Sequence, residues 1–261
     1  MNIQLKTVAQ LTMYLKAKHI VFDDFTYHEE ENKENKYGMK EIPAIRNPYL
    51  WMQVSNKNLI PAIESLLEYH SDWVSVQLCV AILEGAIIRK DLLPAKIINK
   101  LLTLTCVNVK SEEDKKLNLD TILFSIVGLR SQALLEKSLA FVDKHELVIS
   151  ENGVFMKTAL TEVSKTGNQD MINYLLDKFP IMLEKCDAWP YLTAIRYGHY
   201  KLALFFAKKG LDIHAKNDLG YKLLERNYKN NSVNRVGDTK KFEEELMDLY
   251  NMVSLKHEDK A

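Results

Sequence analysis

The sequence predicts an all-α fold, an elongated α-solenoid assembled from helix pairs. Apolar residues recur every three or four positions in one segment after another, which is the spacing of the buried side of an amphipathic helix. These segments are about 10 to 15 residues long and are joined by short turns, as in solenoids rather than in bundles of long helices. The alternation of apolar and polar residues that marks β-strands is scarce.

The amino-acid composition restricts the class of protein and of partner. Lys+Arg and Asp+Glu each total 35 among 261 residues, so the formal net charge is zero. Because proteins that bind nucleic acid usually carry a basic excess, we expect no nucleic-acid partner. No apolar run reaches the roughly 18 residues of a membrane span, and the first residues lack the pattern of a secretory signal peptide. We therefore expect a cytoplasmic protein without a membrane span.

The helices are expected to begin close to the N-terminus. One side of a first amphipathic helix is formed by Leu5, Val8, Leu11, Met13 and Leu15. The polar segment 27–41 is rich in both charges, and we expect a mobile loop there. Further helices are predicted over residues 58–70, 71–88, 90–104, 119–130, 131–145, 153–167 and 168–179.

Local signals place several helix ends. Pro61 is tolerated in the first turn of its helix, where its missing N–H breaks no hydrogen bond. Ser71 or Asp72 is a candidate N-cap for the next helix, which is apolar on most sides and is expected to be buried. Ser131 is the candidate N-cap of a later helix, and the charged segment 110–116 is expected to be a loop.

Glycines organise the segment that follows. Pro190 suits the first turn of a helix, the small Ala194 lets two helices approach closely, and a second apolar helix leads from Gly198 and His199 to Gly210. Gly198 and Gly210 suit left-handed conformations that end a helix and reverse the chain. The turn after Gly210 is predicted to contain Asp212, Ile213 and Ala215, and a further glycine follows at Gly220.

In this register, residues 189 to 220 resemble an ankyrin repeat. A weaker copy lies upstream, where Gly167 precedes Gly198 by 31 residues, close to the repeat length of about 33. Phe179 and Pro180 replace the glycine that ends the second helix of that copy.

The resemblance sets the predicted domain boundaries. Residues 1–150 are a helical region, made either of degenerate repeats or of a separate helical domain. Residues 151–227 are ankyrin-like repeats. Residues 228–261 are a polar linker followed by a C-terminal helix.

The resemblance also implies a binding surface, because ankyrin repeats commonly meet partners with their hairpin fingers and with the concave face of their inner helices. In this sequence the residues at the matching positions are Arg196, Tyr197, His214, Lys216, Asn217, Asp218, Leu219 and Tyr221. Trp189 is a further candidate, either as an exposed aromatic anchor or as a packing residue.

Catalytic chemistry has little support in the sequence. The three cysteines, Cys79, Cys106 and Cys186, are odd in number and widely spaced, which favours a reducing compartment and forms neither a disulfide framework nor a zinc motif. Cys186 and His199 could be imagined as a thiolate–imidazole pair, but packing explains both better. The acidic clusters are mixed with lysines and are interpreted as solvated faces. We expect no catalytic residue, no metal site and no cofactor.

The sequence therefore predicts a non-enzymatic module for protein–protein interaction. Two alternatives stay open: an enzyme or enzyme inhibitor whose activity lies in residues 1–150, with the repeats used for targeting, and a permanent structural scaffold. Glu243, Glu244 and Glu245 form an acidic block near the C-terminus that is similar to the translocation signals of bacterial type IV secretion effectors. That resemblance implies a virulence protein delivered into the host cytoplasm, with a host protein as its partner. Acids in the first turn of a final helix are also favourable electrostatics.

Overall fold

The computed structural model is mostly helical, which confirms the all-α prediction. It describes residues 5–6, 8–17, 28–30, 39–41, 60–90, 93–231, 244–245, 247–249 and 251–252. The chain divides into two compact units, Met1–Ser150 and Glu151–Ala261. Within the described residues, no helix is both long and apolar enough to cross a membrane.

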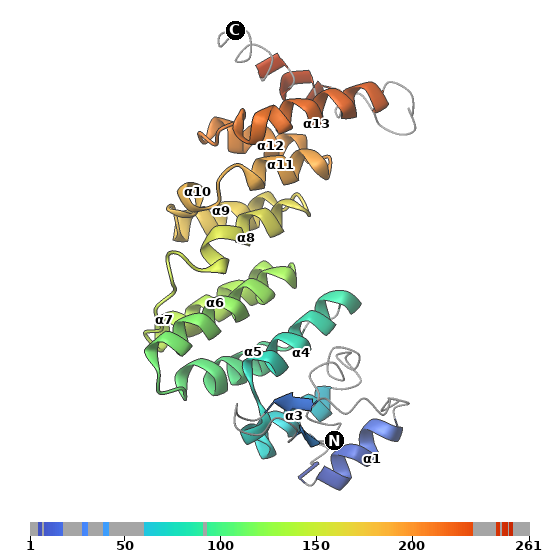
Figure 1. Cartoon of the computed structure of the whole chain (residues 1–261), viewed down its shortest axis with the longest axis vertical. Coiled ribbons are helices and arrows are strands. Elements are labelled where there is room, and N and C mark those ends of the chain that lie inside the picture. Colours follow the sequence, from blue (N-terminus) through green and yellow to red (C-terminus); the bar gives the residue numbers. More distant parts are fainter. Residues whose placement is uncertain are drawn as a thin grey trace. The chain divides into compact units, whose positions relative to one another are not determined.

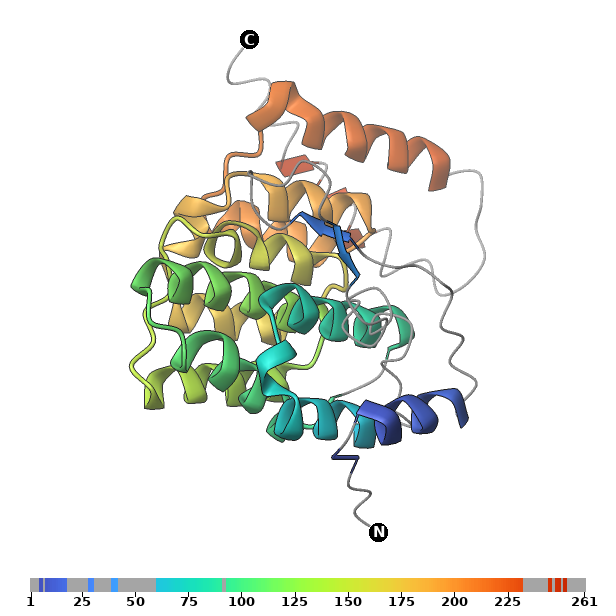
Figure 2. The ribbon, with the colours of Figure 1, turned by 60° about the horizontal axis from the view of Figure 1, so that its bottom comes forward.

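The first unit is a set of helices in two packed rows (Figures 1 and 2). Helices α1, α3, α5 and α7 contact one another in succession, and α4 packs against α6. The elements are α1 (Val8–Ala17), β1 (His28–Glu30), β2 (Met39–Glu41), α3 (Ile60–Tyr69), the 3-10 helix η3 (Ser71–Trp73), α4 (Val76–Arg89), α5 (Ala95–Leu102), the π-helical turn η4 (Thr103–Val107), α6 (Glu112–Gly128) and α7 (Gln132–Lys144).

The short strands correct one expectation. β1 and β2 pair antiparallel, with His28 opposite Glu41, inside the segment that the sequence predicts as a mobile loop. The first helix is also buried less evenly than predicted. Leu11 and Leu15 are fully buried, whereas Met13 is 71% exposed.

Two helix starts differ from the prediction, and capping explains both. The charged segment 110–116 is not a loop, because α6 begins at Glu112 and the Ser111 hydroxyl accepts a hydrogen bond from Asp114 N at 3.2 Å. Acids in a first turn are stabilised by the positive end of the helix dipole. Neither Ser71 nor Asp72 caps α4; Ser75 does so, since its hydroxyl accepts from Leu78 N at 3.2 Å. The Ser131 cap of α7 is confirmed.

The second unit contains α8 (Val154–Ser164), α9 (Gln169–Lys178), α10 (Met182–Lys185), α11 (Trp189–Arg196), α12 (Tyr200–Lys208) and α13 (Ala215–Asn231). Helix α11 is central, since it packs against α8, α12 and α13 (Figure 1). The core of the second unit contains the fully buried rings of Phe155, Tyr191 and Phe206. Residues 228 to 231, predicted as the start of a linker, continue α13 instead.

Gly198 and Gly210 end helices as predicted. Their φ angles are +79° and +99°, in the left-handed region that favours glycine. After α11, Gly198 N donates to Ile195 O at 3.1 Å and His199 N donates to Ala194 O at 2.8 Å. This pair of bonds is a Schellman motif, and the same two bonds recur after α12.

Gly220 has a different role from the one that its sequence context predicts. It lies inside α13 rather than at a chain reversal, and it is buried. A Cβ at this position would lie 2.5 Å from Cε1 of Tyr191, so glycine is required by the close contact between α11 and α13.

The hairpin finger implied by the ankyrin resemblance is also wrong, because α13 begins at Ala215. The first turn of this helix is irregular, since Lys216 and Asp218 both have φ of +58°. His214 Nδ1 lies 2.8 Å from Asp218 Oδ1, and His214 N donates to Asp212 Oδ1 at 2.9 Å. These contacts tie the expected finger into the beginning of the helix.

Candidate functional site

Helix α11 presents one row of side chains to solvent and buries the rest. Pro190, in its first turn, pre-sets the helical φ, and the side chains of Tyr191 and Ile195 are fully buried. Trp189, Thr193 and Arg196 follow one another at steps of four and three residues, which places them on one side of the helix. Trp189 is 49% exposed, so it does not belong to the core.

Helix α13 carries a second row of side chains that faces the row on α11. Leu219, Leu223 and Arg226 have the same spacing of four and three residues. The buried side of the helix is held against α11, because Leu224 is fully buried and Asn227 Nδ2 donates to Ile195 O at 3.2 Å. The contact between the two helices thus fixes the two rows relative to each other.

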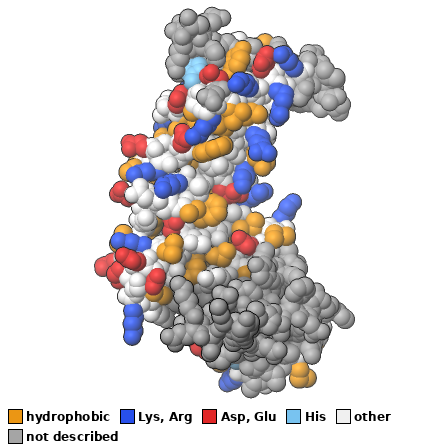
Figure 3. Space-filling view, in the orientation of Figure 1, with side chains coloured by type: hydrophobic (Ala, Val, Ile, Leu, Met, Phe, Trp, Pro, Cys, Tyr) orange, Lys and Arg blue, Asp and Glu red, His pale blue; other side chains and the backbone are white. Residues whose placement is uncertain are grey.

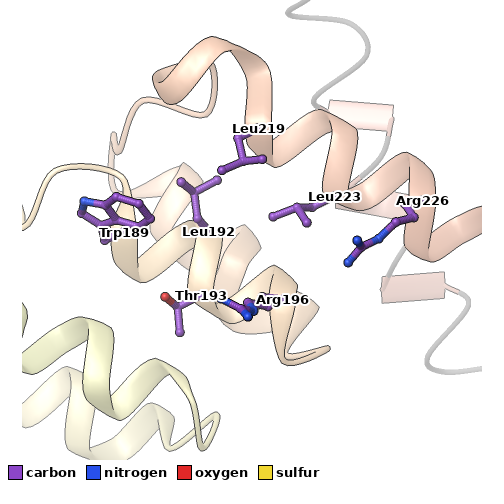
Figure 4. Close-up of a pocket in the computed structure, with 7 residues that line it drawn as sticks. All are labelled: Trp189, Leu192, Thr193, Arg196, Leu219, Leu223 and Arg226. Atoms are coloured by element: carbon purple, nitrogen blue, oxygen red, sulfur yellow. The ribbon is translucent and has the colours of Figure 1, made fainter.

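The two rows line an open pocket of about 280 Å³ (Figure 4). Leu192, Leu219 and Leu223 supply its apolar surface, with Trp189 at one end and Arg226 at the other. On the face of the second unit shown in Figure 3, hydrophobic side chains are likewise bordered by Lys and Arg side chains. The lining residues are Trp189, Leu192, Thr193, Arg196, Leu219, Leu223 and Arg226.

The pocket carries positive charge, and no acidic side chain is among the described residues of its lining. Arg196 and Arg226 are both exposed, and neither forms an ion pair with a side chain in the described part of the chain. Glu225, the neighbour of Arg226, instead binds Lys229, with 2.6 Å between Oε1 and Nζ.

Lys216 differs from the two arginines because it has a carboxylate partner. Its Nζ lies 2.6 Å from Asp187 Oδ2 and 5.7 Å from the centre of the Trp189 ring. The hydrogen bond from Lys216 lowers the pKa of the Asp187 carboxyl. The ion pair of Lys216 therefore connects the start of α13 with the segment just before α11, and its ammonium lies beside the indole.

The predicted site residues separate into three sets. Trp189, Arg196 and Leu219 line the pocket. Tyr197 is 52% exposed and follows the end of α11, outside the lining. The others lie at the start of α13. His214 contacts Asp218, and Lys216 contacts Asp187. Tyr221 is partly buried, and the Asn217 side chain is not among the described side chains.

Four lining residues are missing from the sequence prediction: Leu192, Thr193, Leu223 and Arg226. The steps of four and three residues, from 189 to 196 and from 219 to 226, would have indicated Thr193, Leu223 and Arg226, whereas Leu192 lies on neither pattern. That signal has meaning only if residues 219 to 226 form one continuous helix, whereas the ankyrin resemblance implied a hairpin before Gly220.

The cysteines have the properties of core residues. Burial raises the pKa of Cys106 to about 11 and the pKa of Cys186 to about 12, and it raises the pKa of Cys79 as well. At neutral pH these thiols are therefore protonated and poorly nucleophilic.

His199 and Cys186 have separate hydrogen-bond partners. His199 Nε2 lies 3.1 Å from Lys165 O, and its ring fills the space beside Gly167. Cys186 Sγ donates to Leu183 O at 3.5 Å. Among the described residues, no group of three or more His, Cys, Asp and Glu side chains is placed to hold a metal ion.

Comparison of the chain with models of known protein families, with curated proteins and with solved structures gives no match.

Proposed function

We propose that this chain is a non-enzymatic protein-binding module, and that its partner binds to the pocket surface formed by α11 and α13. The observation that carries the proposal is the pocket itself. It joins a half-exposed indole, an apolar floor and two arginines on two helices that are locked together. Tryptophan and arginine are the residue types most often found at the energetic centres of protein interfaces.

We further propose that residues 151 to 227 are divergent ankyrin-type repeats within an α-solenoid. Three observations support this. The turns at Gly167 and Gly198 lie 31 residues apart and both have positive φ. The His199 ring joins them through its contact with Lys165 O. The helices α8, α11 and α13 also pack in succession, as the first helices of stacked repeats do.

A capture experiment tests the binding function. The full-length chain and its Trp189→Ala variant are immobilised, and the proteins retained from a eukaryotic cell lysate are quantified by mass spectrometry. Loss of the indole should reduce specific capture by tenfold or more, since removing an interface anchor costs about 2 kcal/mol. Leu117→Ala is the matched control, because Leu117 is 65% exposed and lies in the first unit. Equal capture by all three proteins contradicts the proposal.

Delivery into a host cell remains a separate proposal that rests on the acidic block 243–245. Glu245 also has a structural contact, since its Oε1 lies 2.7 Å from Lys201 Nζ. A translocation assay separates the two roles. Glu244→Gln should reduce delivery if the block is a signal, whereas unchanged delivery of this variant assigns the acids to helix packing alone.

A further inference from the structure

We propose that the occupant of the α11–α13 pocket is an acidic amphipathic segment of a partner protein. Its apolar side chains contact the leucine floor, which is the apolar surface formed by Leu192, Leu219 and Leu223. Its carboxylates bind Arg196 and Arg226. This inference rests on the proposed function and adds the chemical class of the partner. It follows from the open shape of the pocket, its charge and its apolar surface.

The open shape of the pocket favours side chains of a macromolecule over a small organic ligand, although its volume is close to that of small-molecule sites. Small-molecule sites are usually concave spaces of about 300–1,000 Å³ that bury most of the ligand. The space between α11 and α13 is about 280 Å³ and is open to solvent. It accepts a few side chains that project from a larger surface.

The charge of the pocket selects an acidic partner. Among the described residues, the lining contains Arg196 and Arg226 and no carboxylate, although the whole chain has a formal net charge of zero. The nearby acids Asp187 and Glu225 are already paired with Lys216 and Lys229. Within the described part of the chain, the two guanidinium groups therefore have no carboxylate partner, and each can bind a carboxylate through two parallel hydrogen bonds.

The apolar surface distinguishes a protein segment from a phosphate-rich partner. Leu192, Leu219 and Leu223 lie between the indole and the Arg226 end of the pocket, where a nucleic-acid backbone would leave them without contacts. An amphipathic segment of a protein contacts the apolar leucines and the charged arginines at the same time. Its apolar side chains exclude water from the floor, and the carboxylates beside them reach the arginines.

Selection from a random peptide library tests the class of occupant directly, because it requires no identified partner. Peptides of about 16 residues are displayed on yeast and selected with the labelled full-length chain, a length that gives about four helical turns. We expect the selected peptides to be enriched in Asp and Glu next to Leu, Ile, Phe or Trp. Selected peptides that are neutral or basic, or a selection that yields none, overturn the inference.

The affinity of the best selected peptide is then measured by fluorescence anisotropy. Arg196→Gln and Arg226→Gln should each weaken binding about tenfold, and Leu223→Ala should do the same through the floor. Lys208→Gln is the matched control, because Lys208 is an exposed cation on α12, and it should change the affinity less than twofold. For the unsubstituted chain, raising the NaCl concentration from about 50 mM to about 500 mM should also weaken binding of the peptide, because salt screens the attraction between opposite charges.

The remaining outcomes separate this inference from the proposed function. If Trp189→Ala abolishes capture from lysate while the arginine variants bind the peptide normally, the binding function stands and the acidic occupant is wrong. Binding of duplex DNA or inorganic polyphosphate as tightly as the peptide assigns the arginines to phosphate recognition and also overturns the inference. Circular dichroism of each variant verifies that it is folded.

Discussion

Gly220 on α13 lies directly against the ring of Tyr191 on α11, so that a Cβ at position 220 would stand 2.5 Å from Cε1 of the tyrosine. This contact sets the separation of the two helices that line the pocket. The shape of the pocket therefore depends on a glycine that has no side chain and on a tyrosine that solvent does not reach.

Gly220→Ala should destabilise the chain. In an exposed helix interior the change would gain about 0.5–1 kcal/mol of helix propensity. Here the new methyl group overlaps the Tyr191 ring, and we expect the free energy of unfolding to fall by about 1–3 kcal/mol. Urea unfolding measures the loss. In a Tyr191→Leu background the same substitution should no longer be destabilising, and a double-mutant cycle without coupling would contradict the contact.

Tyr191→Phe should stabilise the chain. Tyr191 is fully buried, and in the described part of the structure its hydroxyl has no hydrogen-bond partner. Burial raises the pKa of this phenol above its usual range. Because an unsatisfied buried hydroxyl costs about 1–3 kcal/mol, its removal should raise the free energy of unfolding by about 1 kcal/mol.

Tyr200→Phe is the control for that substitution. The Tyr200 hydroxyl accepts a hydrogen bond from Asn227 Nδ2 at 3.1 Å, so the same loss of one oxygen should cost about 1 kcal/mol. If both variants shift the unfolding transition in the same direction, our account of the Tyr191 hydroxyl is wrong.

Gly198→Ala should destabilise the turn after α11. In the described part of the structure, a Cβ at this position meets no atom within 4 Å, so we attribute the cost to the φ of +79°, about 1–2 kcal/mol. Gly198→Asn should cost less, because asparagine tolerates the left-handed region better than alanine. Thermal unfolding of the two variants checks this order, and an equal loss would point to a steric cause instead.

The cysteine thiols should react slowly while the chain is folded. At pH 8, a disulfide reagent such as DTNB should label the native protein far more slowly than the urea-unfolded chain, because all three cysteines are buried. The folded state favours the neutral thiol, since the pKa of Cys106 is raised to about 11 and that of Cys186 to about 12.

The same pKa shifts predict the pH dependence of stability. The unfolded chain releases its thiol protons near the ordinary pKa of about 8.5, before the folded chain does. The stability contributed by these groups is therefore complete below about pH 8 and decreases as the pH rises toward 11. Cys186→Ala should flatten the alkaline decrease, and an unchanged slope would contradict the burial of this thiol.

The sequence predicts this fold best where the signals are local. Ser131 and Gly198 mark helix ends through their own side-chain or backbone chemistry, and both predictions are confirmed. The prediction fails at α13, where Asn217, Asp218 and Gly220 have the composition of a turn. Tertiary packing of the helix against α11 overrides those local preferences, although Lys216 and Asp218 still have left-handed backbone conformations.

The candidate site could be predicted only in part for the same reason. Arg196 is implied by the ankyrin resemblance, and Trp189 is a further candidate of the same repeat. Leu223 and Arg226 become part of the site because α13 is continuous and lies beside α11, which is a long-range property. A sequence pattern does not show that two helices approach each other closely.

Photo-crosslinking from the pocket tests the central claim most directly. A photoreactive amino acid such as benzoylphenylalanine is placed at Thr193, which lines the pocket, or at Leu117, which is exposed in the first unit. After irradiation in a eukaryotic cell lysate, crosslinked proteins are identified by mass spectrometry. We predict that position 193 captures a distinct protein through an acidic segment and that position 117 does not. Identical products from both positions, or none from position 193, would contradict a binding surface between α11 and α13.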